Sequence, residues 1–129
     1  MKNKLLFFII YFPLISFSQG INNLWLLGYP GGGQFGGMNL DFSSGSLVII
    51  EDTTRKMDFN QTNAEICNKN GRLLFYYDGV WISNALNDTM ANGSGLNPSA
   101  FTTSFANIHN GLPLVQANLI IPFSSDSNR

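Results

Sequence analysis

Short apolar runs recur along the chain from residue 24 onward, separated by turns rich in Gly, Asn and Ser. None of them continues with the 3.6-residue period of an amphipathic helix, and their lengths are those of strands. The pattern predicts strands at residues 24–29, 38–42, 46–50, 64–67, 72–77, 80–83 and 114–123. Between residues 84 and 111 the apolar pattern is lost. This predicts a long irregular loop, a kind of segment that often carries function.

Three short segments have the residue types of tight turns. Asn68–Gly71 predicts a four-residue hairpin loop with Gly71 in the left-handed conformation. Ser43–Gly45 and Asp78–Gly79 predict two further turns, because Gly adopts a positive φ without strain. Strands joined by such short turns are expected to pair in antiparallel sheets.

Apolar residues occupy consecutive positions in several predicted strands, as in Leu47–Ile50, Leu73–Tyr77 and Leu119–Ile121. A strand with one wet face would alternate, so these strands are expected to be covered on both faces. Such strands are typical of sheets packed face to face, in a sandwich or between the blades of a propeller. The sequence therefore predicts an all-β fold. Residues 124–129 have the composition of a turn that no partner strand follows, which predicts that the chain is a fragment truncated at its C-terminus.

The first eighteen residues have the pattern of a cleavable secretory signal peptide. Lys2 and Lys4 precede an apolar run from Leu5 to Ile15, and Ser16–Ser18 supplies small residues for the peptidase. The apolar run is too short to span a bilayer, which needs about 20 apolar residues. We therefore expect residues 1–18 to be removed before Gln19, and the protein to be secreted or displayed at the cell surface after export through the periplasm.

Charge and cysteine content narrow the class of partner. Removing Lys2 and Lys4 leaves five basic residues against eight acidic ones, a net charge near −3 without any basic run. Nucleic acids and anionic membranes are therefore not expected partners, because both bind clustered Lys and Arg.

Cys67 is the only cysteine, so no intrachain disulfide can form. Its apolar surroundings favour a buried, inert thiol.

Two motifs resemble catalytic or cofactor-binding signatures only superficially. Gly31–Gly36 matches G-x-G-x-x-G, but strand and turn residues follow it where a dinucleotide site needs a helix, so a flexible turn is expected. His109 is the only histidine, which excludes a multi-histidine metal site. A Ser-His-Asp triad would need His109, yet no G-x-S-x-G elbow is present. His109 is thus expected to be an exposed loop residue.

The remaining candidates are oxygen ligands, carboxylates and aromatic residues. Asp58–Thr62 places oxygen ligands at alternate positions but lacks the glycine and distant glutamate of a calcium loop, so a polar turn is expected. Asp78 and Asp88 could approach each other as glycosidase carboxylates do, although exposed turn carboxylates fit better. Aromatic side chains could stack on a carbohydrate, but aromatic residues at strand positions are expected to lie in the core. The aromatic residues in question are Trp25, Phe75, Tyr76, Tyr77 and Trp81. The sequence therefore predicts no catalytic residues, metal or cofactor.

Several patterns occur in an order that resembles one group of proteins. They are Trp25–Gly28, Met38–Phe42 with Ser44–Gly45, Glu65–Cys67 with Gly71–Gly79, Met90–Gly93, and Gln116–Pro122. In this order they resemble the N-terminal part of large secreted Bacteroidetes proteins, which begin with a β-propeller and often end in a type IX secretion sorting domain. Pro30–Phe35 is longer than the matching stretch of that pattern. Asp52–Thr54 and Asp88–Met90 resemble the Asp-Thr-x acceptor for O-glycosylation in that phylum.

The resemblance implies that residues 19–129 are an incomplete propeller of one to two blades, since a blade takes about 40–50 residues. The function expected is non-enzymatic: loops are presented for binding, with a role in adhesion or at the cell surface. The partner would be a protein or glycan ligand, together with the remaining blades of the full-length chain. Two alternatives stay open. One is a secreted carbohydrate-active or other hydrolytic propeller whose catalytic residues lie elsewhere, and the other is a structural spacer.

Overall fold

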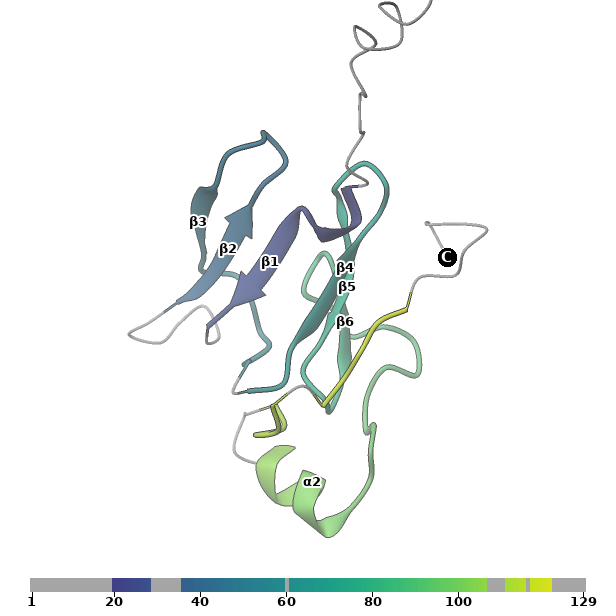
Figure 1. Cartoon of the computed structure of the whole chain (residues 1–129). Coiled ribbons are helices and arrows are strands. Elements are labelled where there is room, and N and C mark those ends of the chain that lie inside the picture. The colour runs from purple at the N-terminus through teal and green to yellow at the C-terminus, as the bar shows by residue number, and fades with distance from the viewer. Residues whose placement is uncertain (1–19, 29–35, 60, 107–110, 116, 122–129) are drawn as a thin grey trace, which may run out of the picture.

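The computed structural model describes residues 20–28, 36–59, 61–106, 111–115 and 117–121, and these form a predominantly β structure (Figure 1). The elements, in chain order, are η1 (a 3-10 helix, Gly20–Asn22), β1 (Leu24–Leu27), β2 (Gly37–Asp41), β3 (Val48–Asp52), β4 (Ala64–Cys67), β5 (Leu73–Tyr77), β6 (Ile82–Asn84) and α2 (Ala100–Ala106). The predicted all-β class is confirmed. Residues 1–18, predicted to be a signal peptide, and His109 lie outside the described residues. No helix within the described ranges is long and apolar enough to cross a membrane.

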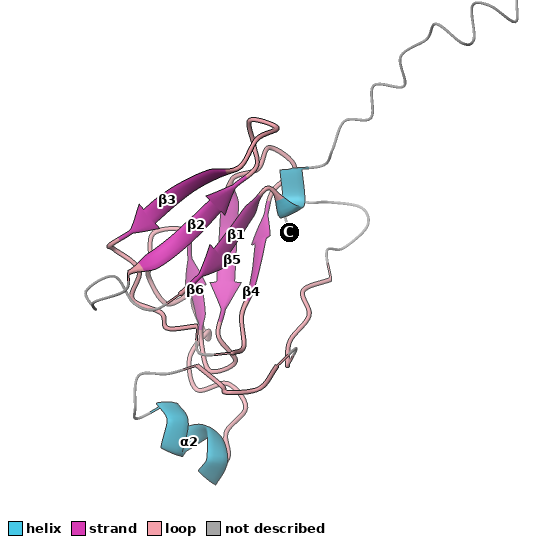
Figure 2. Cartoon of the chain, turned by 60° about the vertical axis from the view of Figure 1, so that its left-hand side comes forward, coloured by secondary structure: helices cyan, strands magenta, loops and turns pink. Residues whose placement is uncertain are grey.

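The six strands form two antiparallel sheets of three strands each. Both are meanders of consecutive strands, in the orders β1-β2-β3 and β4-β5-β6. The sheets approach each other most closely through their first strands, β1 and β4. β3 is the far strand of the first sheet and lies away from the second sheet (Figure 1, Figure 2). The two sheets therefore meet at β1 and β4, and the first sheet extends outward from there.

The hairpin loop predicted at residues 68–71 is confirmed. Gly71 has a φ of 77°, and its N–H donates to the Asn68 carbonyl over 2.9 Å. Asn68 also closes the hairpin, because its N–H donates to the Arg72 carbonyl over 2.8 Å. Glycine is required at position 71 because an L side chain is strained at this positive φ.

Two other predicted turns are longer than expected, which shifts the strands after them. The Gly45 N–H donates to the Phe42 carbonyl, and the Ser44 hydroxyl then donates to the Ser46 carbonyl over 3.1 Å. β3 consequently begins at Val48 rather than residue 46. In the second turn Asp78 Oδ1 accepts from the N–H groups of both residues 80 and 81, so β6 begins at residue 82 rather than 80.

The hydrophobic core fills the space between the two sheets. Phe59 and Tyr76 pack edge to face, with ring centroids 5.9 Å apart and ring planes at 77°. Burying an aliphatic or aromatic side chain of this size stabilises the fold by about 1.5–3 kcal/mol. The core consists of Leu26, Met57, Phe59 and Tyr76, with Leu24, Leu73 and Trp81 packed against it.

The segment predicted as an irregular loop from residue 84 to 111 is instead tightly organised where it is described. Residues 88–96 fold back along the outer edge of β6: Ser83 forms a β-bridge with Thr89, and the Ile82 N–H donates to the Gly93 carbonyl over 2.6 Å. α2 follows, and the Ser99 hydroxyl caps it by accepting from the Thr102 N–H over 3.0 Å. Sequence periodicity missed this because the segment is held by polar contacts, which leave no apolar repeat.

Two asparagines anchor this segment to β5. Asn87 accepts a hydrogen bond of 2.5 Å from the Tyr76 hydroxyl and donates to Thr54 Oγ1 over 2.9 Å. Asn97 donates to the Tyr77 hydroxyl over 2.8 Å. Both asparagines have positive φ, 64° and 52°, which Asn tolerates better than most residues. The segment is therefore part of the fold and not a freely variable loop.

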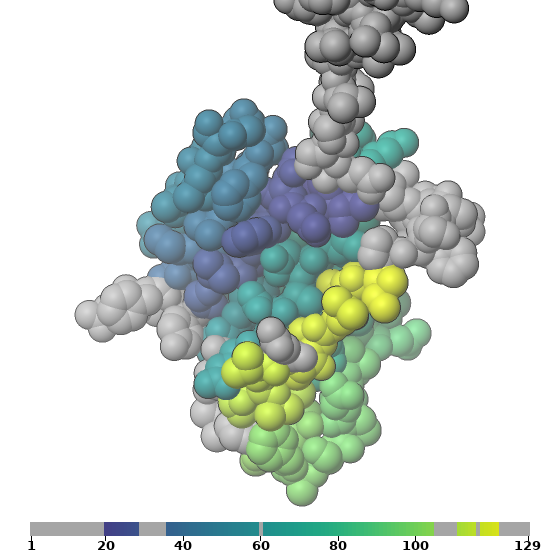
Figure 3. All heavy atoms as spheres, in the orientation of Figure 1, coloured from purple at the N-terminus to yellow at the C-terminus, as the bar shows by residue number. Residues whose placement is uncertain are grey.

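The strand predicted at residues 114–123 does not form within the described part of that range, residues 114–115 and 117–121. This segment runs beside the second sheet (Figure 1, Figure 3). Side chains tether it: Thr62 donates to the Leu114 carbonyl over 2.6 Å, and Asn118 donates to the Tyr77 carbonyl over 3.4 Å. It forms no ladder, and Leu119 and Ile121 are exposed. An apolar run needs a partner edge to become a strand, and none is paired with it here.

Candidate functional site

The most unusual side chain between the sheets is Arg55, which is only 2% exposed. Asp52 Oδ1 accepts hydrogen bonds of 3.0 and 3.1 Å from the N–H groups of Thr54 and Arg55. These bonds form a turn after β3, and the turn brings the Arg55 side chain against the first sheet. Its guanidinium then donates to the Leu27 carbonyl over 2.7 Å and to Asn39 Oδ1 over 2.6 Å. A third bond of 3.2 Å goes to the carbonyl of residue 38. Arg55 thus joins β1, β2 and the end of β3.

The surroundings of Arg55 show that it is a structural group. A Cβ at Gly37 would lie 2.7 Å from the guanidinium carbon, so any side chain there would displace Arg55 from its hydrogen bonds. The guanidinium also lies over the Phe59 ring, 5.2 Å from its centroid. Nε makes no hydrogen bond but is 3.7 Å from Asp52. Burial lowers the pKa of Arg55, and Asp52, Tyr76 and Glu65 oppose that effect. With its donors aimed at the chain's own oxygens, Arg55 is not an open ligand site.

Glu65 on β4 is the second charged group between the sheets. It lies opposite Tyr76 in the β4–β5 ladder, and the Leu26 N–H of β1 donates to its carboxylate. Burial raises the pKa of Glu65 to about 7, although the Leu26 hydrogen bond and the charge of Arg55 pull it down. The junction of the two sheets therefore contains a carboxyl group that titrates near neutrality. Sequence reasoning missed both Arg55 and Glu65, because nothing in their neighbouring residues marks them as buried.

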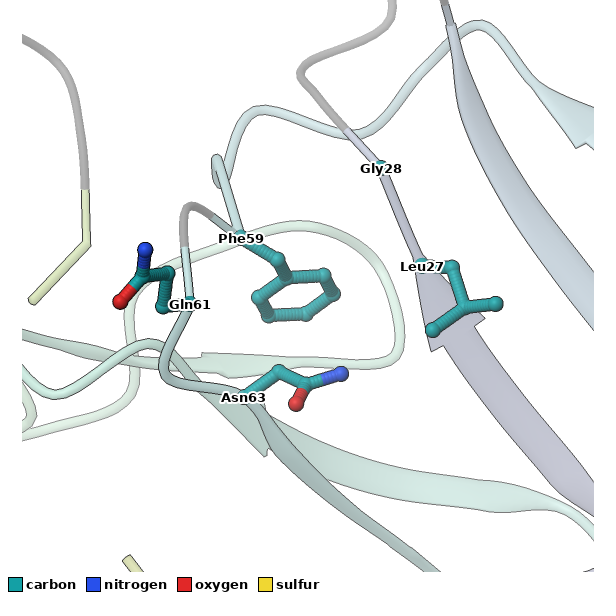
Figure 4. Close-up of a pocket in the computed structure, with 5 residues that line it drawn as sticks. All are labelled: Leu27, Gly28, Phe59, Gln61 and Asn63. Carbon is teal, nitrogen blue, oxygen red and sulfur yellow. The ribbon is translucent and has the colours of Figure 1, made fainter. Parts of the chain in front are cut away.

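A small depression lies at the end of β1, next to this cluster. It has a volume of about 220 Å³ and is lined by Leu27, Gly28, Phe59, Gln61 and Asn63. The Phe59 ring lies between Gln61 and Leu27 (Figure 4). Asn63 already donates to the Leu26 carbonyl over 3.0 Å. Small-molecule sites usually enclose about 300–1,000 Å³. The depression is smaller than this and carries no charged side chain, so we assign it no ligand.

The structure pairs the carboxylates differently from the sequence-based expectation. Asp88 is exposed, as predicted, and forms an ion pair of 3.2 Å with Lys56. Asp78 is buried, which contradicts the prediction of an exposed turn carboxylate. Burial and the nearby Asp78 charge both raise the pKa of Asp58, and burial raises that of Asp78. A Cβ at Gly111 would lie 2.7 Å from Asp78 Cβ and 2.9 Å from the Asp58 carbonyl oxygen, so the returning chain packs against both residues, which are only 3% and 5% exposed. Covered carboxylates cannot reach a polysaccharide.

The segment predicted as a polar turn at residues 58–62 buries two of its polar residues. Asp58 and Thr62 are both buried, and Asn60 lies outside the described residues. Thr62 donates its hydroxyl proton to the chain's own Leu114 carbonyl. In the described residues, no group of three or more His, Cys, Asp or Glu side chains could hold a metal ion.

Two sequence interpretations agree with the structure. Cys67 is fully buried, and burial raises the pKa of its thiol, so the thiolate needed for reactivity is disfavoured. The glycine-rich motif is followed directly by the strand β2, which starts at Gly37, and not by a phosphate-binding helix. Residues 31–35 of that motif lie outside the described residues.

One face of the first sheet is mostly apolar and exposed, and we call it the outer face; Glu51, opposite Met38 in the ladder, lies on it as well. Ladder register places Trp25, Leu40 and Ile49 side by side, and Leu27 next to Met38. Trp25 is 49% exposed and packs against Phe42, with ring centroids 5.1 Å apart. The prediction that Trp25 lies in the core is therefore wrong, and within the described residues this face of the sheet is left exposed at these positions. The exposed members of the outer face are Trp25, Leu27, Met38 and Ile49.

Comparison with known proteins yields no relative: no family model, curated protein or solved structure matches this chain.

Proposed function

We infer that this chain is part of an exported, non-enzymatic β-propeller that presents loops for binding at the cell surface. The observation that carries the proposal is the uncovered outer face. Soluble proteins rarely leave contiguous apolar surface of this kind without a partner. In a propeller, each blade is covered on both faces by its neighbours, so a blade lacking one neighbour would expose such a face.

The arrangement of the two sheets supports the same proposal. Both are meanders, and they contact each other through their first strands, as successive blades do around a central axis. β1 begins at Leu24 and β4 at Ala64, a separation of 40 residues. This matches the period of about 40–50 residues of propeller blades. Residues 88–96 lie along the outer edge of β6 as a series of turns, joined to it by one β-bridge and by backbone hydrogen bonds.

Binding is expected to involve the segment between β6 and α2. Its backbone is held in place by Asn87 and Asn97, while Leu86 is 78% exposed and Met90 is also exposed. A rigid turn that displays exposed apolar side chains is suited to contact a partner, because little conformational entropy is lost on binding.

The proposal predicts binding without turnover. The purified protein is incubated with immobilised mucin, starch and cellulose, and both retention and release of soluble sugar are measured. We expect retention on at least one of them and no sugar release. Leu86→Ser combined with Met90→Ser should weaken retention at least about tenfold, which is about 1.4 kcal/mol. The melting temperature should change little, because both side chains are exposed.

Leu119→Ser is the matched control, since Leu119 is equally exposed but lies outside the segment. It should retain full binding. Sugar release would favour the hydrolytic alternative instead. Equal binding by the double variant and the control would refute a role for this segment.

A further inference from the structure

The two sheets differ in how their outer edges are covered. The outer edge of β6 is occupied by residues 88–96, through hydrogen bonds such as that from the Met90 N–H to the Ile82 carbonyl, 3.0 Å. The outer edge of β3 carries no backbone hydrogen bond to any other described residue. Val48, Ile49 and Ile50 of β3 are all exposed, Ile49 to 57%. The fold therefore covers one edge and leaves the other open.

Proteins usually protect a bare edge with Lys, Pro, a bulge or a covering segment. From Ser43 to Arg55 there is neither Pro nor Lys, and β3 pairs with β2 in an unbroken register. Three consecutive β-branched residues, Val48 to Ile50, form its centre and favour extended pairing. The centre of this edge thus has the residue types of a strand that pairs, and its charged residues, Glu51 and Asp52, are confined to its C-terminal end.

We propose that β3 pairs antiparallel with β3 of a second copy of this chain, forming a six-stranded sheet with a two-fold axis at Ile49. A two-fold axis perpendicular to the sheet pairs residues that share a face. Centred on Ile49, it places Ile49 opposite its own counterpart and Val48 opposite Ile50. Glu51 then lies opposite Leu47, so no two carboxylates of the copies face each other.

Other registers fit this strand less well. An axis at Ile50 would place Ile49 opposite Glu51 and Val48 opposite Asp52. An axis at Val48 would require Gly45 to pair, but Gly45 is in a turn with a φ of 81°. A parallel arrangement in register would bring Glu51 beside its own counterpart, and like charges side by side destabilise a sheet. The acidic end of β3 therefore selects a single register for self-pairing.

The mass of the purified protein is measured by sedimentation over a range of concentrations. A dimer is expected, and Ile49→Lys should raise its dissociation constant at least about tenfold, because two ammonium groups would meet at the axis. Leu86→Lys, on an exposed residue outside both sheets, should leave the dimer unchanged. Circular dichroism confirms that each variant keeps its strands.

A second variant tests the register independently of charge. In directly opposed positions of an antiparallel pair, Cα atoms are about 4.5–5.5 Å apart, which a disulfide can bridge. Ile49→Cys should therefore form a cross-linked dimer under mild oxidation, whereas Ile50→Cys should not. A monomer at every concentration would overturn the proposal. So would a dimer that is insensitive to Ile49→Lys but disrupted by Trp25→Lys, because contact would then be made by the outer face.

Discussion

Arg55→Ala is expected to destabilise the protein by about 3–5 kcal/mol, the usual cost of removing one partner from a buried charged network. The change leaves the carbonyls of Leu27 and Met38 without their donor, and Asn39 Oδ1 and Asp52 without their cation. Small domains are stable by only about 5–15 kcal/mol, so the variant should be largely unfolded at modest urea concentrations. Urea titration followed by circular dichroism measures the loss.

Two variants control for this result. Arg55→Lys should recover little of the lost stability, because an ammonium group cannot reproduce the planar fork that reaches three oxygens. Lys56→Ala removes the adjacent, exposed cation and its surface ion pair with Asp88, and should cost less than about 1 kcal/mol. If Arg55→Ala and Lys56→Ala were equally mild, Arg55 would not hold the strands together.

Glu65→Gln is expected to stabilise the protein above neutral pH. Folded Glu65 keeps its proton up to about pH 7, whereas the unfolded chain releases it near 4.5. Folding therefore takes up a proton between these values, and the contribution of Glu65 to stability falls as pH rises through this window. Below pH 4.5 Glu65 is protonated in both the folded and the unfolded chain, and its full contribution to the stability of the fold is present. Above pH 7 burial of the charge costs about 2 kcal/mol, since each unit of pKa shift is worth about 1.4 kcal/mol and solvent screens part of it.

The measurement compares the two proteins from pH 4 to pH 8. The stability difference between Glu65→Gln and the natural protein should be near zero at pH 4 and reach about 2 kcal/mol at pH 8. The groups around Glu65 that carry or acquire charge are Arg55, Asp52, Tyr76 and Cys67, and they are the same in both proteins. Glu51→Gln makes the same change at an exposed carboxylate and controls for the loss of one negative charge. A pH-independent difference would mean that the half-buried position of Glu65 does not raise its pKa.

Features fixed by a few adjacent residues could be predicted from the sequence. The hairpin at residues 68–71 formed as expected because Gly71 and Asn68 determine it locally. Features that depend on distant partners were not predictable. The described residues among 114–121 have strand composition but no paired edge, and Gly111, more than thirty positions away in the chain, packs closely against the buried Asp78.

The candidate site was harder to predict than the strands. Arg55 follows an ordinary polar turn, and its burial depends on the absence of a side chain at Gly37, eighteen positions earlier. The apolar run Leu47–Ile50 was expected to be covered on both faces, yet the structure leaves it exposed. A run of apolar residues in the sequence indicates that a strand is buried against another surface. It does not indicate whether that surface belongs to the same chain or to another molecule.

Methionine oxidation tests most directly whether the outer face is covered in the native protein. Met38 on this face and Met90 in the loop are similarly exposed, 44% and 40%, whereas Met57 is fully buried. The protein is isolated from its own cells under native conditions, treated briefly with peroxide, and its peptides are analysed by mass spectrometry. Our account predicts that Met90 oxidises rapidly while Met38 is protected to the level of Met57, because a neighbouring sheet covers it. Oxidation of Met38 as fast as Met90 would contradict the account.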